Sequence, residues 1–121
     1  MISVLIVEDD LSLQHLYETM LKTFGFKVLA KASNGKEAMD VFLSLENKPD
    51  VILMDHRMPV KNGIDTTKEI LRSNSQSKII FISADKSIKK EALSIGAVHF
   101  IEKPFSVDTL REEINRIVQP S

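Results

Sequence analysis

Five side chains whose chemistry suits metal ions and phosphate stand directly after apolar runs of this sequence: Glu8, Asp9, Asp55, Ser83 and Lys103. Carboxylates that share one pocket repel one another, and a hard divalent cation with oxygen ligands relieves that repulsion. Mg²⁺ keeps several waters and takes only one or two protein carboxylates, which suits a site open to phosphate. A lysine and a hydroxyl beside it can hold phosphoryl oxygens. The chemistry indicated is metal-assisted phosphoryl transfer to an Asp nucleophile, which forms an acyl phosphate.

These side chains meet only if the apolar runs are strands of one sheet. The predicted strands are residues 2–7, 26–32, 51–54, 78–82 and 98–102. Apolar residues at helical spacing predict the helices between them, over residues 13–24, 35–45, 64–71, 88–95 and 107–117. Strand and helix alternate five times, which predicts an α/β fold with a doubly wound parallel sheet covered by helices on both faces. In such sheets the functional crevice lies beyond the carboxyl ends of the strands.

Composition limits the kind of protein. The 121 residues suit one compact domain, and 43% hydrophobic and 27% charged residues indicate neither disorder nor a membrane span. Sixteen Lys and Arg stand against 17 Asp and Glu, so there is no electrostatic case for binding nucleic acid or a membrane. The absence of cysteine excludes disulfides and thiol catalysis and agrees with a reducing compartment. We therefore expect a cytoplasmic protein.

Four motifs stand at the ends of the predicted strands: Val7-Glu-Asp9, Met54-Asp55-His-Arg-Met58-Pro59 with Gly63, Ser83-Ala84 and Lys103-Pro104-Phe105. They resemble the motifs of the receiver domains of two-component response regulators. The motifs occur in order and at the expected spacing over nearly the whole chain. The resemblance implies a single receiver domain over residues 1–121, with a flavodoxin-like (βα)5 fold and strand order 2-1-3-4-5. It also implies a signalling switch that phosphorylates and dephosphorylates itself and is not a turnover enzyme.

The resemblance assigns roles at the metal and acceptor positions. Asp55 would accept the phosphoryl group from a sensor histidine kinase, a histidine phosphotransfer protein or a small phosphodonor, and would share the Mg²⁺ ion. Asp9 would bind Mg²⁺ directly and Glu8 through water. The main-chain carbonyl of Arg57 would complete the protein ligands, and Lys103 would contact the phosphoryl group.

Further roles concern the output of the switch. Ser83 and Phe100 would form the pair that rearranges on phosphorylation, although Ser83 replaces a frequent threonine and Phe100 a frequent tyrosine. The Lys103–Pro104 peptide bond would be cis. The changed surface would comprise helix 88–95, strand 98–102 and the last helix. A downstream effector or output domain, or a second copy of the phosphorylated chain, would bind there.

Two more positions invite a prediction about the lifetime of the acyl phosphate. Arg57 lies two residues beyond the acceptor and Asp85 two beyond the switch serine. Their opposite charges can pair across the path of the hydrolytic water, and such a pair would slow hydrolysis. The alternative is two unrelated surface charges.

The same residues also have simpler structural interpretations, and the fold is compatible with other functions. Asp55 could merely begin a turn, residues 8–10 could be the acidic first turn of a helix, and Lys103 could be a solvated lysine. We take Asp10 as structural.

A metal-dependent phosphatase would need a second acid and a cap domain, for which 121 residues leave no room. A flavin-binding electron carrier would need a phosphate-cradling loop after the first strand, where this chain has three acids. Residues 119–121 could be a natural tail or the start of a linker.

Overall fold

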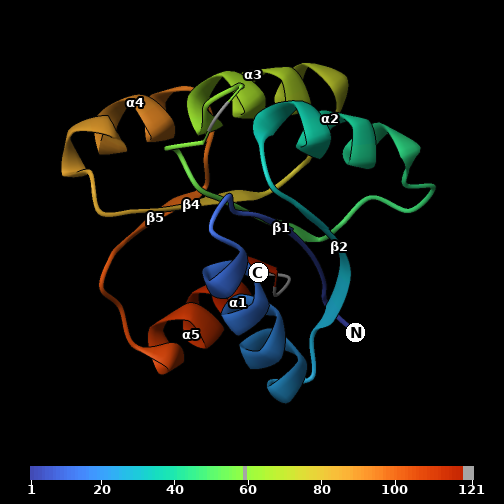
Figure 1. Cartoon of the computed structure of the whole chain (residues 1–121), viewed down its shortest axis with the longest axis vertical. Helices are drawn as coiled ribbons and strands as arrows, with labels where there is room; N and C mark the ends of the chain where they lie inside the picture. Colours follow the sequence, from blue (N-terminus) through green and yellow to red (C-terminus); the bar gives the residue numbers. More distant parts are fainter. Residues whose placement is uncertain (59, 119–121) are drawn as a thin grey trace.

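Five parallel strands form the middle layer of the molecule (Figure 1). A computed structural model describes residues 1–58 and 60–118. Pro59 of the second motif and the tail 119–121 lie outside these residues. The strands are β1 (Ser3–Val7), β2 (Lys27–Ala32), β3 (Val51–Met54), β4 (Ile79–Ser83) and β5 (His99–Glu102). Their order, β2-β1-β3-β4-β5, confirms the order that the resemblance implied.

Helices cover both faces of this sheet. They are α1 (Leu11–Thr23), α2 (Gly35–Ser44), α3 (Gly63–Ser73), α4 (Lys89–Ser94) and α5 (Val107–Val118). Figure 1 shows α1 and α5 on one face of the sheet and α2, α3 and α4 on the other. The doubly wound α/β fold predicted from the alternation is therefore confirmed.

Polar side chains set where the first three helices begin. Asp10, Asn34 and Asn62 each accept hydrogen bonds from amides of the helix that follows, which satisfies donors that a helix start leaves free. The structural role expected for Asp10 is thus confirmed. Helix α1 begins at Leu11, earlier than its apolar spacing indicated, because this cap fixes the first turn.

The fourth helix differs from its prediction. Residues Lys86–Ile88 form a 3₁₀ turn, and α4 proper covers only Lys89–Ser94. The Asp85 carboxylate accepts from the amide of Ser87 and caps the 3₁₀ turn, whereas α4 has no side-chain cap. The helical stripe of residues 88–95 is correspondingly weak.

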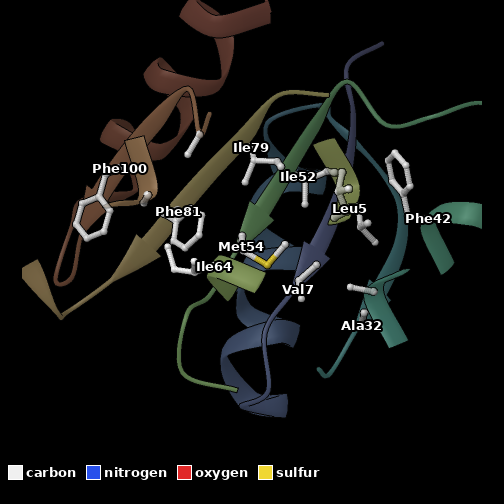
Figure 2. Close-up of a cluster of buried hydrophobic side chains, with 14 of the residues drawn as sticks. Leu5, Val7, Ala32, Phe42, Ile52, Met54, Ile64, Ile79, Phe81 and Phe100 are labelled. Carbon is white, nitrogen blue, oxygen red and sulfur yellow. The ribbon is translucent and has the colours of Figure 1, made fainter. Parts of the chain in front are cut away.

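Two apolar layers hold the helices to the sheet. One cluster joins the sheet to α2, α3 and α4, and Figure 2 shows its labelled members, which include Phe42, Met54, Phe81 and Phe100. The other joins the sheet to α1 and α5 through side chains such as Leu21 and Leu110. Burying each large apolar side chain stabilises the fold by roughly 1.5–3 kcal/mol. Within residues 1–58 and 60–118, no helix has the length and apolarity to cross a membrane.

Candidate functional site: an acidic cleft at the carboxyl edge of the sheet

Backbone hydrogen bonds between neighbouring strand ends bring the predicted site residues to one edge. The amide of Asp55 donates to the carbonyl of Val7 at 3.0 Å, and the amide of Lys103 donates to the carbonyl of Ser83 at 3.0 Å. An open cleft of about 780 Å³ lies over this edge. Its lining includes all the predicted charged or polar residues: Glu8, Asp9, Asp55, Arg57, Ser83, Asp85 and Lys103.

Three carboxylates form the floor of the cleft. Glu8, Asp9 and Asp55 each offer an oxygen atom, and these atoms lie within 4.8 Å of one another. Glu8 and Asp55 are buried, whereas Asp9 is exposed. All the donor atoms are oxygens and one ligand faces solvent, so this set fits a hard cation that keeps waters, such as Mg²⁺.

Glu8 is a buried carboxyl group with a raised pKa. Its side chain has only 3% of its surface exposed, and its Oε1 atom lies 3.5 Å from Nζ of Lys103. The pKa of Glu8 is raised to about 7: burial is the largest cause and the nearby charge of Asp55 also raises it, against a hydrogen bond from the amide of Asp10 and the charge of Lys103. Burial also raises the pKa of Asp55, which Lys103 partly offsets. A bound cation would favour the ionised form of both carboxyl groups.

Ser83 and Phe100, the predicted switch pair, are both buried. The Ser83 hydroxyl accepts a hydrogen bond from the amide of Asp85 at 3.0 Å. Phe100 is 6% exposed and is paired in register with Phe81. Its ring lies among the side chains of the cluster on the α2, α3 and α4 side (Figure 2). The inward arrangement of this ring is therefore the one present in the structure.

Arg57 and Asp85 form the ion pair that their positions predicted. Nη2 of Arg57 lies 3.4 Å from Oδ2 of Asp85 at the mouth of the cleft. Asp85 also accepts hydrogen bonds from the hydroxyl and amide of Ser87. These bonds lower the pKa of Asp85, and Arg57 lowers it further.

The loops around the cleft explain two elements of the motifs. A Cβ atom at Gly63 would lie 2.3 Å from the carbonyl oxygen of Asp55, so only glycine lets α3 start this close to the acceptor. The Lys103–Pro104 peptide bond is cis, the isomer that the resemblance implied. Val60, in the loop after Asp55, has a φ of 70°, a left-handed conformation that is unfavourable for a β-branched residue.

Sequence reasoning missed a buried polar side chain of α1. Gln14 is buried beside the strand ends. Tyr17 is buried, as its place in the apolar stripe of residues 13, 16, 17, 20, 21 and 24 predicts, whereas Leu16 of the same stripe is 49% exposed. The available signal was Gln14 itself, a polar residue next to an otherwise apolar stripe. The spacing alone could not give the rotational phase of the helix, since apolar residues follow one another at positions 16 and 17.

An apolar groove extends from the cleft between α1 and the loop after β5. It has a volume of about 420 Å³ and shares Leu13, Ala84 and Lys103 with the cleft. Its remaining lining is mostly apolar: Leu16, Tyr17, Met20, Pro104, Phe105 and Val107. The ring of Phe105 packs against that of Tyr17, with 6.2 Å between centroids.

A doubly wound sheet with an acid triplet, a hydroxyl and a lysine at its carboxyl edge defines a phosphorylatable α/β switch domain. The family model of the response regulator receiver domain matches residues 4–115, and the chain belongs to this family.

Relatives and solved structures agree with this assignment. The chain is 37% identical over 116 residues to the chemotaxis protein CheY of Thermotoga maritima, which covers 94% of this chain and 95% of that protein. The response regulator TrrA of T. maritima, solved in complex with Mg²⁺ and BeF, matches with a TM-score of 0.87 and 27% identity over 97% of this chain and 99% of that one. The CheX–CheY–BeF3–Mg²⁺ complex of Borrelia burgdorferi matches with a TM-score of 0.92 and 25% identity, over 98% and 90% of the two chains.

Proposed function

We propose that this chain is a phosphorylatable switch of a two-component phosphorelay and that Asp55 is its phosphoacceptor. The observation that carries the proposal is the acid triplet within 4.8 Å, which shares one cleft with Lys103 and Ser83. A carboxylate oxygen of Asp55 attacks phosphorus, and the bond from phosphorus to the histidine nitrogen of the donor breaks as the new O–P bond forms. The test is incubation of the purified chain and of Asp55→Asn with acetyl phosphate and Mg²⁺, which should phosphorylate wild type and leave Asp55→Asn unlabelled.

Different residues of the cleft would bind the metal ion and the phosphoryl group. Glu8, Asp9, Asp55 and the main-chain carbonyl of Arg57 would hold Mg²⁺, Asp9 directly and Glu8 through water. A cation bound by these residues would neutralise negative charge on the transferring phosphoryl group. Lys103 binds a phosphoryl oxygen as a positive point charge. Support comes from the fit of the oxygen donors and from TrrA, which was solved with Mg²⁺ and BeF.

The donor, a sensor histidine kinase or a histidine phosphotransfer protein, docks on the apolar groove beside the cleft. The groove shares Leu13, Ala84 and Lys103 with the cleft, so a partner seated there is next to Asp55. Leu16 and Val107 line the groove and are both exposed. Exposed apolar side chains that gather in a groove mark an interaction site.

The output depends on Ser83, Phe100 and the surface of α4, β5 and α5. The phosphoryl group draws the Ser83 hydroxyl away from the Asp85 amide, and the packing around Phe100 responds. A downstream effector or output domain, or a second phosphorylated copy of the chain, binds the altered surface. The CheX–CheY complex supports partner binding in this family.

The proposal also covers the domain organisation, the location and the phosphoryl lifetime of the chain. Residues 1–121 act as a single cytoplasmic receiver domain that binds neither nucleic acid nor a membrane directly. The chain accepts and releases its own phosphoryl group and does not turn over a substrate. The Arg57–Asp85 pair at the cleft mouth slows hydrolysis of the acyl phosphate.

A further inference from the structure

A buried glutamine in α1 joins the ends of two strands beneath the cleft. Gln14 is 8% exposed. Its Nε2 atom donates to the carbonyl of Glu8 at 3.0 Å and to the carbonyl of Ala32 at 3.2 Å. The two hydrogens of one amide group thus satisfy acceptors at the end of β1 and the end of β2.

This amide closes a junction that includes the acidic segment. The carbonyl of Ala32 also accepts from the amide of Glu8 at 3.0 Å, so both the amide and the carbonyl of Glu8 are fixed. Further along the chain, Asp10 caps α1 through the amides of Ser12 and Leu13. Asp9 lies between these two anchor points.

The junction also controls the direction of the Glu8 carboxylate. That carboxylate accepts from the amide of Asp10 at 3.1 Å and lies 3.5 Å from Lys103. Both contacts depend on the backbone position of Glu8, because the main chain sets where its side chain starts and in which direction it leaves. The amide of Gln14 donates to main-chain carbonyls, so it acts on the cleft through the backbone of Glu8.

We propose that Gln14 is a positioning residue that holds Glu8 and Asp9 in the geometry required for cation binding. This inference rests on the proposed function, since it concerns the same acid triplet. Loss of the amide frees the carbonyl of Glu8 and lets the segment 8–10 adopt several arrangements, only some of which bring the three carboxylates together. Groups that orient metal ligands typically contribute about 10–100-fold to metal affinity.

The test compares variants at Gln14 with a buried position on the same helix that lies away from the cleft. Gln14→Met keeps the length of the side chain but removes both donors, and Gln14→Asn keeps an amide that is too short to reach both carbonyls. Leu21→Val is the control, because Leu21 is fully buried in the core on the α1 and α5 side. If Gln14→Met does not fold, the milder Gln14→Asn carries the test.

Three measurements are made on each variant: calorimetry, urea unfolding and amide exchange. Calorimetry with Mg²⁺ should show about tenfold weaker binding in Gln14→Met, less loss in Gln14→Asn and none in Leu21→Val, with urea unfolding reporting stability. In metal-free protein, the Asp10 amide should exchange with solvent faster in the Gln14 variants alone. Wild-type affinity and exchange in the Gln14 variants would overturn the inference, as would equal weakening in Leu21→Val.

Asp9→Asn separates this inference from the proposed function. If wild type fails to bind Mg²⁺, or if Asp9→Asn binds as well as wild type, the proposed site itself is wrong. If Asp9→Asn weakens binding and Gln14→Met does not, only the role of Gln14 is wrong.

Discussion

At the scale of single residues, Glu8 makes the stability of the metal-free protein depend on pH. Its pKa is about 7 in the folded protein against an ordinary 4.5, so the folded state binds more protons than the unfolded state between these values. The stability that Glu8 contributes is therefore fully present below about pH 4.5. It is lost as the pH rises through about 7. The loss is on the order of 3 kcal/mol, because each tenfold change in protonation equilibrium is about 1.4 kcal/mol.

Urea unfolding between pH 5 and 8 with a chelator present checks this prediction. We expect the free energy of unfolding of wild type to fall across this range and that of Glu8→Gln to fall less, because the amide does not titrate. The pKa of Asp55 is also raised, so this group acts in the same direction in both proteins. Equal slopes would contradict the raised pKa of Glu8.

The Arg57–Asp85 pair, also a residue-scale feature, predicts the lifetime of the acyl phosphate. Arg57→Ala or Asp85→Ala should shorten it severalfold and no more, since exposed ion pairs are weak and are screened by salt. High salt should shorten the lifetime of wild type but leave both variants unchanged. Loss of labelled phosphate over time, with Mg²⁺ present, provides the measurement. Unchanged lifetimes in both variants would leave these residues as ordinary surface charges.

At the scale of elements, we expect β4 and β5 to carry the proposed coupling between Ser83 and Phe100. Ser83→Ala should still accept a phosphoryl group, but phosphorylation should change the environment of Phe100 less than in wild type, because the hydroxyl that responds is gone. A ligand shifts an equilibrium only if it interacts differently with the two states. NMR signals of the Phe100 ring, recorded before and after phosphorylation, report this change. Identical changes in the two proteins would argue against coupling.

Helix α1 carries the second element-scale prediction, which concerns the groove. Leu16→Glu places a charge in the apolar groove and should slow phosphoryl transfer from a histidine kinase or phosphotransfer protein by about tenfold, roughly the effect of losing 1.4 kcal/mol of binding. Phosphorylation by acetyl phosphate should be unaffected, since this donor needs no docking surface. Leu43→Glu is the matched control, because Leu43 is similarly exposed but lies on α2, across the sheet. Equal transfer rates for the two variants would exclude the groove as the docking site.

At the scale of the whole molecule, the alternation of apolar runs and helical stripes was sufficient to predict the layers and the edge where the acids meet. The strand order was not contained in these local patterns, because β3 and β4 are both buried throughout and any apolar run can pair with another. The order came from the family resemblance, which rests on four motifs in register.

Other features could not be predicted because packing decides them. The choice between Gln14 and Leu16 as the buried side chain depends on the rotational phase of α1, which the Asp10 cap and the hydrogen bonds of Gln14 help to fix. The inward position of Phe100 depends on the space left by its neighbours in the cluster. The groove exists only once α1 lies beside the loop after β5.

The most direct test of the central claim is the mass of the protein after incubation with acetyl phosphate and Mg²⁺. Wild type should gain one phosphoryl group, and the gain should disappear with a chelator. Asp55→Asn should gain none, whereas Asp65→Asn, which changes an exposed carboxylate in the first turn of α3, should behave as wild type. Full labelling of Asp55→Asn, or no labelling of wild type with Mg²⁺ present, would contradict the account.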